Sequence, residues 1–78
     1  MPQLELYGTA GCPYTSELRE WLEWKGKDFA EFDVEKDIEA LRRLQALVQP
    51  PYTVPLLLED GRVIQVGWQG RSCVVGGA

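Results

Sequence analysis

Cys12 is the residue of this sequence whose surroundings predict the most specific chemistry. It lies in the stretch Gly-Cys-Pro-Tyr-Thr at residues 11–15, after an apolar run and before a helical pattern. Proline is favoured at the first helical position, so Pro13 puts Cys12 at the N-cap of the expected helix. The unpaired N–H groups and the helix dipole favour a thiolate there. We therefore expect Cys12 to be a nucleophile suited to thiol–disulfide exchange, although a free cysteine is more commonly a buried, unreactive side chain.

The second cysteine, Cys73, is the candidate partner thiol. The sequence contains no histidine, which excludes Cys–His catalysis and most zinc sites, and we expect no metal. A loop of about sixty residues closes at modest cost, because the entropy of closure grows only logarithmically with length. Cys73 can therefore resolve a mixed disulfide on Cys12 if the two Cα atoms approach within about 7 Å. Residues 72–75 can instead pack as a terminal apolar cap, and the sequence leaves both roles open.

The elements that must position these cysteines follow the order β-α-β-α-β-β. Four strands are expected, at residues 4–7, 28–34, 54–59 and 62–66. Two helices are expected, from residue 13 to the Lys-Gly pair at 25–26, and from the capping residue Asp37 to the proline pair at 50–51. Asp60-Gly61 is a typical two-residue hairpin turn between the last two strands. Residues after Gly67 show no helical period, so a C-terminal helix is expected to be short or absent.

These connections predict a mixed four-stranded sheet with helices packed against it. A helix between two strands forms a crossover, which makes the first two strands parallel, whereas the Asp60-Gly61 turn makes the last pair antiparallel. Ligands of such sheets bind beyond the carboxyl ends of the parallel strands, and Cys12 follows the first strand at that end. The predicted topology and the predicted chemistry therefore indicate the same place.

The composition predicts a single globular domain, residues 1–78. The chain has 78 residues, 45% of them hydrophobic and 26% charged, and a net charge of −4. No basic cluster exceeds a pair of arginines, so no nucleic-acid partner is expected. No apolar run approaches the roughly 20 residues of a membrane span, and we expect no membrane partner. The first residues lack the pattern of a secretory signal, so we expect a cytoplasmic protein, in which a disulfide is more often transient than structural.

Three motifs resemble those of the glutaredoxin group within the thioredoxin-like superfamily. They are Cys12-Pro13-Tyr14 after the first strand, Thr53-Val54-Pro55 before the third, and the pair Gly67-Trp68 after the fourth. The resemblance implies a thioredoxin-like α/β fold and a cis peptide bond before Pro55, beside the Cys12 sulfur, although such a proline can also simply begin an edge strand. It further implies that the Val54 backbone pairs with an incoming disulfide-containing chain. The residues that it implies for substrate binding are Pro13, Tyr14, Thr53, Val54, Pro55, Gly67 and Trp68.

The sequence also departs from the glutaredoxin pattern. Thr15 stands where dithiol glutaredoxins carry their second cysteine, so no disulfide can form within the motif. Thr9 and Gly70 stand where that family has a lysine and an acidic residue for glutathione, which argues against glutathione binding. Residues 67–71 are similar instead to a stretch of NrdH redoxins, which thioredoxin reductase reduces. The chain is also similar to small glutaredoxin-like proteins with selenocysteine-containing relatives. Trp68 can act as a lid beside Cys12 or simply cover the sheet edge.

We therefore expect a thiol–disulfide oxidoreductase in which the Cys12 thiolate attacks protein or glutathione mixed disulfides. Either Cys73 or an external thiol then releases the product from Cys12. No bound cofactor is expected, and glutathione is a candidate co-substrate. The candidate sources of electrons are glutathione and thioredoxin reductase. Two alternative functions belong to other functional classes. One is a non-catalytic module that binds an extended peptide at Val54 and Pro55, and the other is a redox sensor in which oxidised Cys12 condenses with Cys73.

Overall fold

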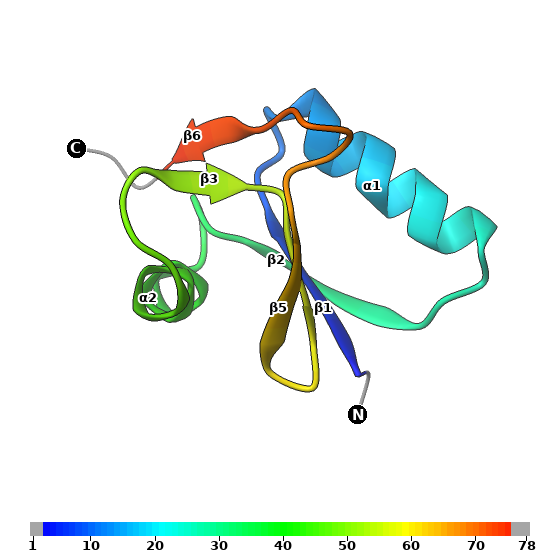
Figure 1. The fold of residues 1–78 in the computed structure, drawn as a ribbon, viewed down its shortest axis with the longest axis horizontal. Coiled ribbons are helices and arrows are strands. Elements are labelled where there is room, and N and C mark those ends of the chain that lie inside the picture. The colour runs from blue at the N-terminus through cyan, green and yellow to red at the C-terminus, as the bar shows by residue number, and fades with distance from the viewer. Residues whose placement is uncertain (1–2, 76–78) are drawn as a thin grey trace.

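The computed structural model describes residues 3–75, which form two helices and six strands (Figure 1). The helices are α1 (Pro13–Trp24) and α2 (Ile38–Leu47). The strands are β1 (Leu4–Gly8), β2 (Phe29–Asp33), β3 (Tyr52–Val54), β4 (Leu56–Glu59), β5 (Arg62–Val66) and β6 (Cys73–Val75). Within the described residues, no helix has the length and apolar character needed to cross a membrane.

The main sheet has four strands in the order β2-β1-β4-β5. β1 is parallel to β2 and antiparallel to β4, and β4 is antiparallel to β5. Asp60 and Gly61 connect β4 to β5 with φ angles of 52° and 80°, the left-handed conformation that a two-residue hairpin requires. The predicted mixed sheet and its hairpin are therefore confirmed.

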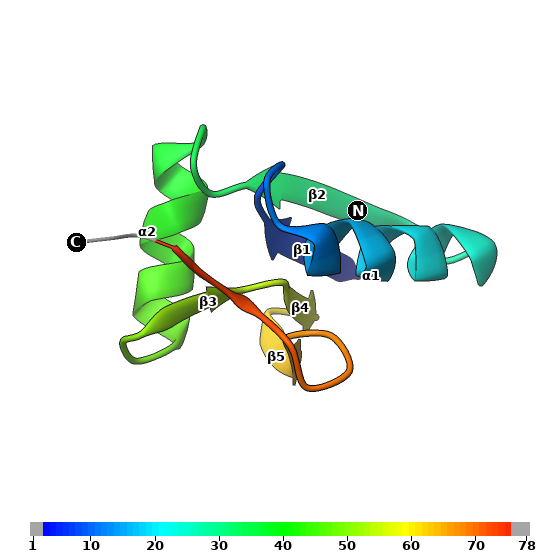
Figure 2. The same ribbon diagram turned by 90° about the horizontal axis from the view of Figure 1, so that it is seen from above.

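The two helices cover opposite faces of the main sheet (Figures 1 and 2). Successive residues of a strand point to opposite faces, and β1 shows this directly. Leu6 packs in a cluster with Leu18 of α1, whereas Tyr7 packs in another cluster with Leu44 of α2. Cys12 belongs to the second of these clusters, so the candidate nucleophile lies on the side of α2 although its own helix is α1.

Local signals set the ends of both helices. Cys12 is the N-cap residue of α1 and Pro13 opens its first turn, while Gly26, with φ of +71°, follows its last turn. The Asp37 side chain accepts hydrogen bonds from the N–H groups of Glu39 and Ala40 at 3.0 and 3.2 Å, which caps α2 as expected.

The prediction of one strand over residues 54–59 is wrong. Pro55 interrupts it, because proline has no N–H to donate to a strand ladder. Tyr52–Val54 instead forms β3, which pairs with β6, and Leu56–Glu59 forms β4, which pairs with β1 and β5. Residues 67–75 contain no helix, which agrees with the expectation for this segment, but the strand β6 was not predicted.

Candidate functional site

A disulfide bond joins Cys12 and Cys73 at the centre of the candidate site. Their Cα atoms are 6.0 Å apart although 61 residues separate them in the sequence. That distance lies within the usual range for disulfides and below the Cα–Cα limit of about 7 Å stated in the sequence analysis. The two cysteines therefore form a pair, and the structure represents the oxidised form of the protein.

The Cys12 sulfur lies between the start of α1 and the loop at Pro55. Cys12 has extended backbone angles and its side chain makes no capping hydrogen bond, while its carbonyl oxygen accepts from the N–H of Thr15 at 3.2 Å. Its Sγ atom is 3.9 Å from the carbonyl oxygen of Val54. The residue is only 1% exposed. The sulfur thus occupies the position that the sequence predicts, but in this oxidised form solvent does not reach it.

The peptide bond between Val54 and Pro55 is cis, which confirms the conformation that the family resemblance implied. Both residues are fully buried. A second cis bond, between Pro50 and Pro51 just before β3, was not predicted. The loop at Pro55 therefore forms one wall around the Cys12 sulfur, and the first turn of α1 forms the other.

β6 runs alongside β3 and occupies the backbone edge that was predicted for an incoming chain (Figures 1 and 2). The strands are antiparallel, and the facing pairs are Tyr52 with Val75, Thr53 with Val74, and Val54 with Cys73. The register brings Cys73 opposite Val54, directly beside the Cys12 sulfur. The chain itself thus supplies both the strand and the cysteine that the resemblance implied for a substrate.

A tight turn between β5 and β6 directs the chain back to this edge. The Gly67 N–H donates to the carbonyl oxygen of Pro55 at 2.7 Å. Trp68 and Arg71 exchange two backbone hydrogen bonds of 2.7 and 2.9 Å, and Gln69 and Gly70 between them have φ angles of 52° and 78°. These are the features of a second two-residue hairpin turn. The Gln-Gly dipeptide is a weaker signal than Asp-Gly, so the sequence reasoning missed this turn.

The remaining predicted binding residues differ in their burial and in the core cluster that they contact. Pro13 is exposed at the start of α1, while Tyr14 and Thr53 are half-buried. Tyr14 packs against the cluster that contains Cys12. Trp68 packs against the other cluster, with its ring 5.7 Å from that of Trp21. The indole therefore covers the α1 side of the sheet in this structure, and a role for Trp68 in substrate binding stays a prediction.

Thr15 fills the position of the missing motif cysteine and is completely buried. Its hydroxyl group has no hydrogen-bond partner within residues 3–75. Gly8 at the end of β1 faces it so closely that a Cβ atom on Gly8 would collide with the Thr15 side chain. The close packing of β1 against α1 at this point fixes the first turn of the helix next to Cys12.

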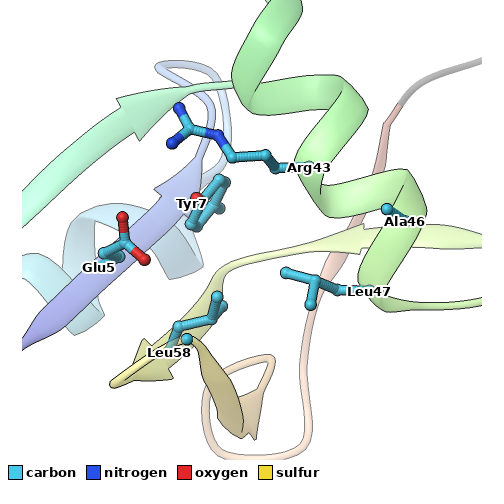
Figure 3. Close-up of a pocket in the computed structure, with 7 residues that line it drawn as sticks. Glu5, Tyr7, Arg43, Ala46, Leu47 and Leu58 are labelled. Carbon is cyan, nitrogen blue, oxygen red and sulfur yellow. The ribbon is translucent and has the colours of Figure 1, made fainter.

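A cavity of about 250 Å³ lies between α2 and the main sheet (Figure 3). Its lining consists of Glu5, Tyr7, Arg43, Ala46, Leu47, Leu58 and Gly61. The Arg43 guanidinium carbon lies 5.9 Å from the centre of the Tyr7 ring. Burial raises the pKa of the Tyr7 hydroxyl above its usual value of about 10, and the Glu5 carboxylate adds to this effect while Arg43 opposes it. Among the described residues, no group of three or more acidic or cysteine side chains is placed to hold a metal ion.

Comparison with known proteins confirms the family resemblance that the sequence motifs indicate. The sequence model of the glutaredoxin family matches residues 4–64. A mutant of the thioredoxin-like protein BC3987 is 33% identical, with a TM-score of 0.76 over 88% of this chain and 86% of the other. Glutaredoxin grx-1 from Archaeoglobus fulgidus is 22% identical, with a TM-score of 0.69 over 87% of this chain and 77% of the other. At this identity the similarity supports the fold of this chain and not its function. Among curated proteins, no sequence matches the chain.

Proposed function

Since the chain belongs to the glutaredoxin family, whose members act on disulfides or glutathione, we propose that it is a thiol–disulfide oxidoreductase working through Cys12 and Cys73. The observation that carries the proposal is the disulfide between these residues at the start of α1, beside the loop at Pro55. The helix dipole and the N–H groups of the first turn favour a thiolate on Cys12 once the bond is reduced. Thr15 cannot form a disulfide, so Cys73 is the partner thiol.

The reaction transfers two electrons from the cysteine pair to an external disulfide. The Cys12 thiolate attacks one sulfur of that disulfide, the bond between the two external sulfurs breaks, and one external thiolate leaves with the electron pair. The Cys73 thiolate then attacks the Cys12 sulfur and releases the second external thiolate. The products are a reduced substrate and the Cys12–Cys73 disulfide seen in the structure.

External thiols restore the dithiol form and require no bound cofactor. Cys73 is half-buried whereas Cys12 is 1% exposed, so the incoming thiolate attacks the Cys73 sulfur and Cys12 leaves as a thiolate. A second external thiolate then attacks the external sulfur of this mixed disulfide and releases Cys73. The two electrons come either from two glutathione molecules, which are then co-substrates, or from the dithiol of a reductase.

The test compares disulfide reduction by the wild type, Cys12→Ser and Cys73→Ser, with Ser72→Ala as a control at an exposed neighbouring position. The substrates are insulin and a glutathionylated peptide, and the reductants are glutathione and thioredoxin reductase in turn. We expect Cys12→Ser to lose activity by at least about a hundredfold, because the nucleophile is gone. Cys73→Ser should form a mixed disulfide on Cys12 that persists when no external thiol is supplied, and mass spectrometry would identify it.

Alkylation of the reduced protein and its oxidation by peroxide, together with this experiment, separate the alternatives. Full activity of Cys12→Ser would overturn the proposal. A reduced wild type whose Cys12 resists alkylation at neutral pH and shows no turnover would instead be a peptide-binding module. Formation of the Cys12–Cys73 bond by peroxide alone, without any reaction with disulfides, would identify a redox sensor.

A further inference from the structure

The edge of β3 beside Cys12 is covered by the segment Cys73–Val75 of the same chain. This segment has every feature of a bound extended substrate: it pairs antiparallel with β3, its cysteine lies opposite Val54, and that cysteine is bonded to Cys12. β6 therefore shows how a cysteine-containing strand pairs with this edge.

The side chains of β6 differ sharply in their exposure to solvent. Val75 is 8% exposed and packs in the same cluster as Tyr7, Leu44 and Cys12. Val74 is 72% exposed. Alternate residues of a strand point to opposite sides, so the cysteine and the residue two positions after it face the core while the residue between them faces solvent. The edge of β3 thus offers one apolar subsite besides the position of the cysteine.

The family resemblance already implies that an incoming chain pairs with the Val54 backbone. Building on the proposed function, we propose that the partner segment paired with β3 carries an apolar residue two positions after its cysteine, in the pattern cysteine, any residue, apolar residue. The segment runs in the direction of β6, antiparallel to β3. Its cysteine takes the place of Cys73 and its apolar side chain takes the place of Val75. Backbone pairing supplies part of the affinity in such strand addition, and the side-chain subsite supplies the selectivity.

The partner segment and β6 exclude each other because both use the same edge. With β6 in place the Cys12 sulfur is buried, so β6 must leave before Cys12 attacks a partner disulfide. When β6 returns, it brings the Cys73 thiolate to the Cys12 sulfur and displaces the partner segment from β3. The step that resolves the mixed disulfide is thereby the step that releases the reduced partner.

Short peptides test the subsite without altering the core of the protein. The probes are capped peptides Arg-Ser-Cys-Val-Val, Arg-Ser-Cys-Val-Asp and Arg-Ser-Cys-Asp-Val, each carrying a nitrothiobenzoate mixed disulfide on its cysteine. Attack by Cys12 of the reduced Cys73→Ser protein joins the peptide to Cys12 and releases the coloured nitrothiobenzoate thiolate, which measures the rate. The two aspartate peptides have the same charge and composition. They differ in the position of the carboxylate, which is next to the cysteine on the solvent side of the strand or two residues away on the core side.

We expect aspartate two positions after the cysteine to lower the second-order rate constant by about tenfold, equivalent to about 1.4 kcal/mol. Aspartate directly after the cysteine should change it by less than about threefold, because that side chain faces solvent. Equal rates for the two aspartate peptides would overturn the docking proposal and leave the proposed function intact. The mixed disulfide of glutathione with nitrothiobenzoate serves as a strand-free reference, and no reaction even with this probe would overturn the proposed function itself.

Matched variants of the protein test the competition between β6 and the partner. Val75→Asp in the Cys73→Ser background removes the apolar anchor of β6, and we expect the Val-Val peptide to react several times faster. Val74→Asp carries the same charge on the solvent side of the strand and should react at the parent rate. An unchanged rate for Val75→Asp, in a variant whose circular dichroism matches the parent, would show that β6 does not compete for this edge.

Discussion

Gly67 and Gly70, in the turn before β6, have the same φ of +78° but different surroundings. A Cβ atom on Gly67 would lie 2.7 Å from the carbonyl oxygen of Arg71, whereas nothing lies within 4 Å of a Cβ atom on Gly70. Both positions strain an L-residue through the backbone, but only Gly67 adds a collision with main-chain atoms. Gly67 is therefore the glycine that the path of the chain toward Cys12 requires.

We predict that Gly67→Ala lowers the free energy of unfolding by about 3 kcal/mol and Gly70→Ala by about 1 kcal/mol. Urea denaturation of the oxidised proteins measures both values, and Gly70→Ala serves as the control for the cost of the backbone conformation alone. Gly67→Ala should also slow closure of the Cys12–Cys73 disulfide, because the turn no longer holds Cys73 near Cys12. Equal losses at the two positions would show that the Arg71 carbonyl moves away without cost.

At the level of elements, one ion pair joins α1 to β2. The Arg19 Nε and Nη2 atoms donate to the Glu31 carboxylate, each with a shortest contact of 2.7 Å. The Glu31 hydrogen bond is also the main cause of the raised pKa of Arg19. The two side chains are 31% and 34% exposed, so solvent and salt screen the pair. The pair orients α1 on the sheet more than it stabilises the fold.

We predict a coupling energy of about 0.5 kcal/mol between Arg19 and Glu31 at low salt. A double-mutant cycle with Arg19→Met, Glu31→Gln and the double variant measures it by urea denaturation. The coupling should fall toward zero in about 1 M sodium chloride, where the Debye length is only about 3 Å. Arg42→Met, at an exposed position of α2, is the control for loss of a surface charge. A coupling that persists at high salt would contradict the screened character of the pair.

The elements that the sequence predicts well are those defined by local signals. Pro13 marks the start of α1, Asp37 caps α2, and Asp60-Gly61 turns the chain between β4 and β5. β6 has no such signal, because a three-residue strand shows too little alternation and its partner β3 lies some twenty residues earlier in the chain. Cys12 is bonded to Cys73 of β6 and is 1% exposed. The position of the nucleophile could therefore be predicted from local sequence, but its pairing with β6 and its burial could not.

For the whole molecule, we expect the redox state of one bond to affect both the stability and the exposure of the candidate site. A chain of 78 residues buries a modest fraction of its surface and is marginally stable without a covalent link. The Cys12–Cys73 bond spans 61 residues, and it restricts the unfolded chain far more than it restricts the folded one. Reduction therefore lowers the free energy of unfolding, and it also removes the covalent link that holds Cys73 of β6 beside β3.

We predict that reduction lowers the free energy of unfolding by about 4 kcal/mol, the value that chain entropy gives for a loop of this length. Urea denaturation with and without a dithiol reductant measures the difference, and Cys73→Ser, which lacks the bond, should give the same curve in both conditions. Hydrogen exchange adds the spatial test: the amides of β3 and β6 should lose far more protection on reduction than those of β1 and β4, because their pairing is held by the disulfide. A uniform loss of protection across all strands would mean that reduction weakens the whole domain without releasing β6, and Cys12 would then have no route to a partner strand.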